Sequence, residues 1–574
     1  MNNKKEYLQA FILIALSTFI SHFLFFRDFG LYEDDYYNIP PYFNLSFSSL
    51  FEIIKVSTVN WLQGRPLSFM PYFFTMIGFK AGGISGLYAI AFIINTVNSF
   101  LVYLIIKKVL SNSELFALSG AVLFCLFPSD TTKTLLIHSF LYQMSMMFFL
   151  SATLIYIKGF KKISYAVIIL SLLSYEPAFI LFFAVPFLNT DKDKPDKKSI
   201  LIHFSIMTLI LFFSYFYRKF AGETRVDDLS SNIGEYIFKS GVSMLSAPLI
   251  NFYLFLRAPL IPVLNFDIFI LIVVAILFTI LFIVFRRLNS DDSEKSSDFT
   301  INLIHKRISL KLNLSSSRKF IRSLILFPVS LLFICIAYAL SFTHYPPTAV
   351  TGRLTSVHLA ASFGGSLFFA SLLSVIYEMF SKTGKRNIFV LLISLYLSLL
   401  AGYGIVIQKD FTGSWKNQKN FWTEVIKICP DIIDGTLIIL ENNGKQKLPY
   451  TNYILSNSWA DPIILQRIFK FPEEWINPPR LFVLNNGLES RVKIENDTLK
   501  WKVPESTTFS HWETLPDSNF ILLSVNERKE IIRTDSQFVS LKCKNFFLKP
   551  KTQSMIQNYD KSILYDLLIM KQEK

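Results

Sequence analysis

Long unbroken runs of apolar residues dominate the first two thirds of the chain. A bilayer core of about 30 Å needs about 20 apolar residues in a helix, and lipid offers the backbone no hydrogen-bond partner. The runs therefore predict an all-α polytopic bundle of transmembrane helices. The eleven predicted spans cover roughly residues 8–26, 85–106, 115–128, 139–157, 163–175, 177–189, 200–217, 267–285, 323–341, 357–377 and 387–407.

Basic residues are concentrated in the loops that follow the even-numbered spans. Basic loops stay preferentially in the cytoplasm, so this alternation predicts a cytoplasmic N-terminus. An odd number of spans then places the C-terminus on the opposite side. The clusters are Lys4-Lys5, Lys107-Lys108, 158–162, 192–198, 286–322 and 382–386.

Two loops on the predicted outer side are long and partly apolar. In the first, 27–84, residues 47–62 have the spacing of an amphipathic helix at the membrane interface. The apolar stretch 67–79 is too short to span and predicts an interfacial or re-entrant segment. The second loop, 218–266, contains the apolar run 241–262, for which the same interfacial placement is expected.

The pattern changes after residue 407. Short β-branched or alternating runs at 436–440, 480–484 and 520–525 are separated by Pro, Asn and Gly, which predicts a small mixed α/β domain. The chain is therefore divided into a transmembrane domain, 1–407, and an extracytoplasmic domain, 408–574. Cys429 and Cys543 would pair only if this tail lies in an oxidising compartment.

Composition and charge support a membrane protein rather than a nucleic-acid-binding one. Hydrophobic residues make up 52% of the chain and charged residues 17%, against about 25% charged in a soluble domain. The chain has 57 Lys and Arg against 42 Asp and Glu, but from residue 408 onward only 23 against 20. The positive excess therefore belongs to the short loops of the bundle, and no nucleic-acid partner is expected.

Three adjacent carboxylates, Glu33, Asp34 and Asp35, follow the first span directly. Carboxylates this close repel one another, and partial burial would raise that cost. Such a cluster is typical of a general base, a metal site or a contact with a cationic partner. The alternative is a solvated loop that ends the first span.

Further polar residues lie in the other outer loops. Arg65 starts an apolar stretch and could bind a lipid phosphate, although a lone interfacial Arg more often reaches toward headgroups. Glu176 falls in a tight turn near membrane depth and should be functional or paired. The remaining candidates on this side are Asp130, Arg218, His344 and Arg353.

The order and spacing of several short motifs resemble a known family. They are Asp34-Asp35; Arg65-Pro66-Leu67 with Gly86-Leu87-Tyr88 and Asn95; Phe127-Pro128 with Asp130; Ser174-Tyr175-Glu176; Gly352-Arg353-Leu354-Thr355-Ser356; and Trp415, Phe421-Trp422 and Cys429-Pro430. In this pattern the chain resembles the C-type glycosyltransferase superfamily, polytopic enzymes that use polyprenyl-phosphate-linked sugars. It is most similar to bacterial relatives of the tetratricopeptide-carrying protein O-mannosyltransferases.

The chain also departs from the pattern of that family. Asn95 and Phe127 stand where the family has His residues, and the tail has no tetratricopeptide repeats. The acceptor, whether glycan, lipid or protein, therefore cannot be carried over. The resemblance implies a multi-pass protein of the bacterial cytoplasmic membrane.

The resemblance implies an inverting transfer of a sugar, expected to be a hexose, from a polyprenyl phosphate to an acceptor hydroxyl. Asp35 or Asp34, with Asp35 slightly preferred, would act as general base, and Arg353, Arg65 and Arg218 would stabilise the leaving phosphate. No cofactor is required, although Asp34 and Asp35 could hold a divalent ion. The expected positioning residues are Glu33, Asp130, Glu176 and His344.

Three other classes stay open at this point, one of them a receptor or scaffold whose outer tail is the working part. A polysaccharide polymerase or ligase also has many spans and a large outer loop, but it acts through basic and His residues on a late loop. A lipid or solute transporter would place ionisable groups near the bilayer midplane, often in inverted repeats, and the sequence shows no such repeat.

Overall fold

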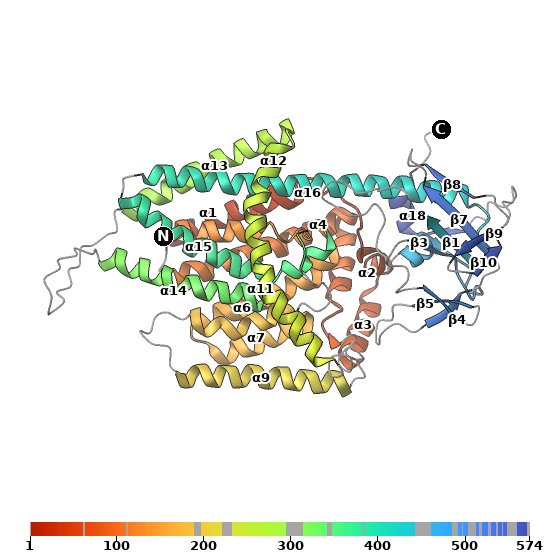
Figure 1. Cartoon of the computed structure of the whole chain (residues 1–574), viewed down its shortest axis with the longest axis horizontal. Coiled ribbons are helices and arrows are strands. Elements are labelled where there is room, and N and C mark those ends of the chain that lie inside the picture. Colours follow the sequence, from red (N-terminus) through yellow and green to blue (C-terminus); the bar gives the residue numbers. More distant parts are fainter. Residues whose placement is uncertain are drawn as a thin grey trace.

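The structure is a computed structural model of the chain (Figure 1). It describes residues 2–60, 64–110, 113–188, 197–220, 232–293, 314–340, 347–349, 351–382, 385–441, 461–484, 492–495, 498–502, 512–515, 519–525, 530–534, 538–541, 544–547 and 559–570.

The described residues up to 428 are mostly helical, in agreement with the helical bundle predicted for this part of the chain. Its helices are α1 (Asn2–Thr18), η1 (Phe19–Phe23), α2 (Asp35–Asn38), η2 (Pro40–Tyr42), α3 (Phe47–Asn60), α4 (Met70–Val109), α5 (Glu114–Cys125), η4 (His138–Tyr142), α6 (Gln143–Ile157), α7 (Lys161–Ser174), α8 (Glu176–Ile180), η5 (Leu181–Leu188), α9 (Lys197–Phe220), α11 (Ile233–Arg257), η6 (Ala258–Leu260), α12 (Ile261–Leu264), α13 (Ile268–Ser293), α14 (Leu314–Ile336), η7 (Arg353–His358), α15 (Ala361–Lys382) and α16 (Arg386–Ile428).

Eight helices within the described ranges are long and apolar enough to cross a membrane, and seven of them coincide with predicted spans. Three shorter apolar helices, Glu114–Cys125, Glu176–Leu188 and Phe320–Ile336, also match predicted spans. The predicted span 163–175 corresponds to α7, whose 14 residues extend only about 21 Å. Helix length therefore does not establish the predicted count of eleven.

The outer surface of these helices is strongly apolar. Phe213 on α9 is 64% exposed, and Ile283 on α13 is 61% exposed. Large exposed apolar surfaces of this kind are rare on soluble monomers. The bundle is therefore compatible with a multi-pass membrane protein.

The segment 241–262 lies within Ile233–Leu264, the one long apolar helix among the described residues that coincides with no predicted span. Its length would allow it to cross a bilayer. In Figure 1, however, α11 runs across the direction of α9 and α16 instead of beside them.

Helix α4 consists of two helical parts that meet at a sharp bend. Gly82 and Gly83 are non-helical, and Gly83 has a φ of 60°. Across the bend Gly86 packs on Gly78, and a Cβ at Gly86 would lie 2.1 Å from the Gly78 oxygen. The predicted separation of the apolar stretch 67–79 from the span 85–106 is confirmed.

Helix α16 joins the bundle to the C-terminal region without a break. Its 43 residues extend about 65 Å, far more than a bilayer core requires. The predicted boundary after residue 407 therefore falls inside a helix, and the predicted helix 415–428 is the end of α16. Figure 1 shows this helix running along the bundle to the C-terminal strands.

The C-terminal region contains small sheets and short helices. The largest sheet has the strand order β3-β1-β7-β8, with β1 parallel to β3 and β7, and β8 antiparallel to β7. The predicted strands at 436–440, 480–484 and 520–525 are confirmed as β1, β3 and β7. The elements are β1 (Thr436–Glu441), η8 (Asp461–Ile463), α17 (Ile464–Ile468), β2 (Phe469–Lys470), β3 (Arg480–Leu484), β4 (Val492–Glu495), β5 (Thr498–Lys502), β6 (Trp512–Leu515), β7 (Asn519–Val525), β8 (Ile531–Arg533), β9 (Phe538–Leu541), β10 (Lys544–Phe547), β11 (Asp560–Lys561) and α18 (Ile563–Leu568).

A buried ion pair attaches this sheet to the end of α16. Arg533 on β8 donates to both carboxylate oxygens of Asp431, at 2.6 and 3.1 Å. Both side chains are almost completely buried. Breaking such a pair costs about 3–5 kcal/mol, so the sheet is held firmly against α16.

Candidate functional site

Glu33 and Asp34 lie in a sharp turn that leads into α2, and Asp35 is the first residue of that helix. Glu33 has a φ of 53°, which is uncommon for a residue other than glycine. The turn packs on α16: the Tyr36 hydroxyl donates to Gln418 at 2.6 Å, and Gly30 lies against the ring of Trp415. A tight turn fixed on a long helix holds the carboxylates in place.

Asp35 is completely buried and acts as an acceptor for three backbone groups. The amides of Ile137, Leu136 and Tyr32 donate to its carboxylate at 2.9, 3.2 and 3.2 Å. Burial raises the pKa of Asp35 to about 7, although these hydrogen bonds oppose the shift. Asp35 therefore connects the acidic turn to the backbone of Leu136 and Ile137.

Asp34 instead faces a cation and is partly open. A guanidinium nitrogen of Arg353 lies 2.8 Å from its carboxylate, and the side chains of Asp34 and Arg353 are 20% and 28% exposed. Glu33 also lies within electrostatic reach of Arg353. The structure thus brings together three of the predicted site residues, from segments more than 300 positions apart.

Arg65, Glu176 and Arg218 form a second group, named here the Glu176 triad. Arg65 donates to both Glu176 oxygens, with the shortest contact 2.9 Å, and Arg218 contacts the other side of the carboxylate. Arg218 also donates to the Gly64 oxygen at 3.1 Å. Glu176 was expected to be functional or paired, and it is paired with two arginines.

Two tyrosines lie between the Asp34–Arg353 pair and the Glu176 triad. The rings of Tyr142 and Tyr175 stack at 3.8 Å between centroids, and the Arg65 guanidinium lies 4.7 Å from the Tyr175 ring. Tyr142 is within electrostatic reach of Arg65, Asp34 and Arg353. The two charged groups therefore belong to one site. Tyr175 stood beside Glu176 in a recognised motif, whereas no sequence signal marked Tyr142.

The turn that carries Arg353 is fixed by a network of threonines. The Gly352 amide donates to the Thr131 hydroxyl at 2.9 Å, and the Thr131 amide donates to the Thr355 hydroxyl at 3.0 Å. Thr355 in turn donates to the Gly352 oxygen at 2.8 Å. A directed network of this kind restricts the position of Arg353.

A histidine network fixes the other end of the same turn. His358 lies 3.0 Å from the Thr348 oxygen, which can only accept, so the Nε2 of His358 donates there. Its Nδ1 then accepts from the Tyr338 hydroxyl at 2.6 Å, and Asn251 donates to that hydroxyl at 2.8 Å. When His358 is neutral, the network selects this one tautomer.

Asp130 is buried in its own loop, away from the contacts of Asp34. It accepts from the amide and hydroxyl of Thr132 at 3.0 and 2.6 Å. Burial raises the pKa of Asp130. Its neighbour Thr131, not Asp130 itself, reaches the Arg353 turn.

Three other predictions have limited structural outcomes. His344 lies outside the described residues, so its predicted role is not tested. Cys543 also lies outside them, so the pairing of Cys429 with Cys543 is not tested either. In the described ranges no group of three or more His, Cys, Asp or Glu residues is arranged to hold a metal ion.

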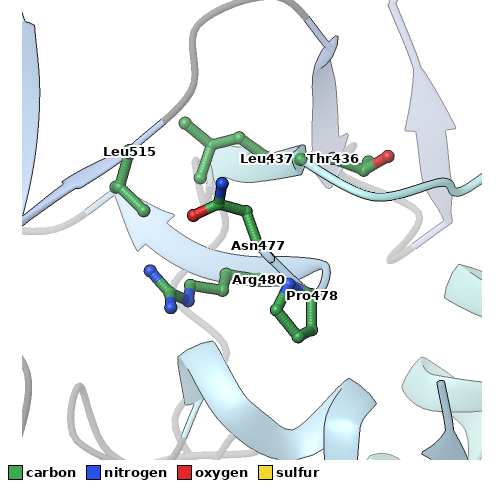
Figure 2. Close-up of a pocket in the computed structure, with 7 residues that line it drawn as sticks. Thr436, Leu437, Asn477, Pro478, Arg480 and Leu515 are labelled. Carbon is green, nitrogen blue, oxygen red and sulfur yellow. The ribbon is translucent and has the colours of Figure 1, made fainter. Parts of the chain in front are cut away.

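A small pocket in the C-terminal region contains none of the predicted site residues (Figure 2). It lies where β1 and β3 begin, and it is lined by Gly435, Thr436, Leu437, Asn477, Pro478, Arg480 and Leu515. Arg480 is already paired with Glu513 at 3.0 Å and lies over the Trp501 ring at 4.6 Å. These contacts explain Arg480 as a structural residue of the sheets.

Comparison of the chain with models of protein families, with curated proteins and with solved structures gave no match. The family resemblance therefore rests on the sequence motifs alone.

Proposed function

We propose that the protein transfers a sugar from a polyprenyl phosphate to an acceptor hydroxyl at the outer face of the bacterial cytoplasmic membrane. The basic loops support a cytoplasmic N-terminus. In Figure 1 the start of the chain and the C-terminal strands lie toward opposite ends of the bundle, which is the arrangement that this orientation requires. The acidic turn lies at the end of the bundle that faces the C-terminal region.

The observation that carries the proposal is the Asp34–Arg353 pair. A partly exposed carboxylate lies in contact with a partly exposed guanidinium, at 2.8 Å. A glycosyl transfer from a phosphate needs one group that accepts a proton and another that stabilises the phosphate charge. This pair supplies both.

In the proposed reaction, the acceptor oxygen attacks the anomeric carbon and loses its proton to Asp34. The bond between that carbon and the phosphate oxygen breaks, and its electron pair stays on the phosphate. Protonation removes the charge of Asp34 as charge develops on the phosphate. Arg353 can then exchange one anion for the other, and direct displacement inverts the anomeric centre.

The burial of Asp35 shifts the assignment of the base toward Asp34. A general base must come within about 3 Å of the proton that it removes. Asp35 has no exposed surface and is bonded to three backbone amides. We therefore assign Asp35 a positioning role. In the same proposal the Glu176 triad, with two arginines on one carboxylate, attracts the phosphate of the donor.

The proposal is tested with the full chain in nanodiscs, a panel of polyprenyl-phosphate hexoses and the class of acceptor that the deletion strain below identifies, by measuring the release of polyprenyl phosphate. Asp34→Asn should lower turnover by about 100-fold or more, because general-base catalysis contributes about 10²–10⁴. Asp28→Asn is the matched control, since Asp28 is an exposed carboxylate in the same loop. Equal turnover of the wild type and the Asp34 variant would remove the mechanism.

A second experiment identifies the acceptor. Mass spectrometry of surface glycans, lipids and glycoproteins in a deletion strain should show the loss of one hexose from one class of molecule. Unchanged glycans would favour the transporter hypothesis.

A further inference from the structure

The C-terminal region contacts α2, the helix that begins at Asp35, through a short helix of its own. Ile464, Leu465 and Ile468 of α17 are buried, and α17 packs against α18, β3 and α2. Figure 1 shows α2 at the end of the bundle that faces the C-terminal strands. The region is therefore in contact with the element that follows Asp34.

Arg467 on α17 has a rigidly held backbone. Its oxygen accepts a hydrogen bond from the Ser562 hydroxyl, and the Ser562 amide donates to the Ile468 oxygen at 3.0 Å. These contacts fix the backbone of Arg467 against the start of α18.

The Arg467 side chain carries a charge for which the described residues supply no carboxylate partner. Its Nε is buried and makes no hydrogen bond to them. The phenols of Tyr37 and Tyr42 act on it electrostatically, and burial lowers the pKa of Arg467. A guanidinium stays charged in proteins, and a guanidinium nitrogen that is shielded from water without a hydrogen-bond partner is costly. An anionic ligand would remove this cost.

The surrounding tyrosines come from the first outer loop. Tyr42 stacks on Tyr72 at 3.9 Å between ring centroids and 28° between ring planes. The Tyr37 amide donates to the backbone oxygen of Asp34 at 3.2 Å. Tyr37 therefore lies within one turn of the residue proposed as the base. Aromatic faces and phenolic hydroxyls beside a guanidinium are suited to a sugar that carries a negative group.

We propose that Arg467, together with Tyr37, Tyr42 and Tyr72, binds an anionic group of the acceptor. This inference rests on the proposed glycosyl transfer and adds the acceptor class: a molecule with a phosphate or carboxylate near the hydroxyl that receives the sugar. Arg binds both groups in a bidentate way, so the shared chemistry is an oxyanion with two available oxygens. The C-terminal region would thus contribute directly to the acceptor site.

The test is a binding titration that needs neither donor nor turnover. The full chain in nanodiscs of neutral lipid is titrated with inorganic phosphate, glycerol 1-phosphate, glucuronate and glucose, and the bound fraction is followed by ligand-observed NMR. The wild type should bind at least one anion and not glucose. Preference for glycerol 1-phosphate over glucuronate would indicate a phosphate-bearing acceptor, and the reverse a carboxylate. Failure to bind any of the anions would overturn the proposal.

Substitutions of Arg467 test whether the anion binds at this residue. Arg467→Met should weaken binding at least tenfold and Arg467→Lys by less, whereas Lys470→Met, which removes an exposed charge three residues away, should leave it unchanged. Equal binding by Arg467→Met and Lys470→Met would refute the assignment. The thermal unfolding temperature is recorded for each variant, and Arg467→Gln, tested in the same way, replaces Arg467→Met if the latter does not fold.

Two further variants separate this inference from the proposed function. The titration is repeated in Arg353→Gln, because phosphate also fits the donor site, and the loss caused by Arg467→Met should persist there. Asp34→Asn should bind the anion as the wild type does. Normal turnover in Asp34→Asn with anion binding lost in Arg467→Met would remove the reaction mechanism but keep the anion site.

Discussion

The Asp34–Arg353 pair and the Glu176 triad use the same residue types in different proportions. The pair joins one carboxylate to one guanidinium, and its side chains are 20% and 28% exposed. The triad joins two guanidiniums to one carboxylate, and its side chains are 14–16% exposed. A balanced, accessible pair suits a step in which charge moves. A closed group with excess positive charge suits permanent attraction of an anion.

The largest effect should follow from removing the carboxylate of the triad. Glu176→Gln leaves two mostly buried arginines without a counter-charge, and breaking a buried pair costs about 3–5 kcal/mol. Thermal unfolding in nanodiscs measures the loss. The control is Glu235→Gln, because Glu235 forms an exposed pair with Lys239 and should cost less than about 1 kcal/mol. Equal stability of the two variants would show that the triad does not hold the fold together.

The next effect separates the arginines of the two groups. Arg353→Gln should lower turnover by about 100-fold or more, as expected when a group that stabilises developing charge is removed. Arg218→Gln should lower it less than tenfold, because Arg65 still contacts Glu176. Steady-state rates of the two variants with a polyprenyl-phosphate hexose measure this difference. A larger loss of turnover in Arg218→Gln than in Arg353→Gln would mean that the triad, not the pair, stabilises the developing charge.

The stability of the folded protein should depend on pH through Asp35, which positions the acidic turn. Folding raises the pKa of Asp35 to about 7, from about 4 in an unfolded chain. The folded state therefore holds a proton that the unfolded chain releases, so stability should fall as the pH rises from about 4 to 7 and level off above it. Unfolding temperatures at pH 5, 6, 7 and 8 measure this slope. Asp35→Asn should reduce the slope and Asp28→Asn should not; identical slopes in all three proteins would contradict the burial argument.

The smallest effect concerns the anchoring of Arg353. Thr131→Val keeps the side-chain shape but leaves the Gly352 amide without its acceptor, at a cost of about 1–3 kcal/mol. Turnover should fall about tenfold as Arg353 loses its fixed position. Thr58→Val is the control, because the Thr58 hydroxyl is exposed and bonds only to α3. A change in stability without a change in turnover would make Thr131 purely structural.

Periodicity predicted much of the fold because the relevant signals are local. The apolar runs predicted most of the long helices, and alternating β-branched residues predicted β1, β3 and β7. The count of spans was not settled, since α7 is short for a bilayer and the helix Ile233–Leu264 is long enough to cross one although no span was predicted there. The continuity of α16 was missed because Trp415 to Ile428 is amphipathic, and an amphipathic end looks like a separate helix.

The candidate site was predicted in part. Asp34, Arg353, Arg65, Arg218 and Glu176 were chosen as charges on one predicted side, and they do lie together. The difference between Asp34 and Asp35 could not be predicted, because adjacent residues have the same local signal and differ only in what surrounds them. Tyr142 and Arg467 were missed for the same reason.

The sequence by itself determined which segments are helical or extended and where charge is gathered, because these depend on the spacing of neighbouring residues. The tertiary structure alone decided that Asp35 is buried, that Asp34 contacts Arg353, and that Arg467 of the C-terminal region lies near Tyr37 and Tyr42. These properties depend on partners hundreds of positions away, and burial and pairing of a charge are set by such partners rather than by its neighbours in the chain.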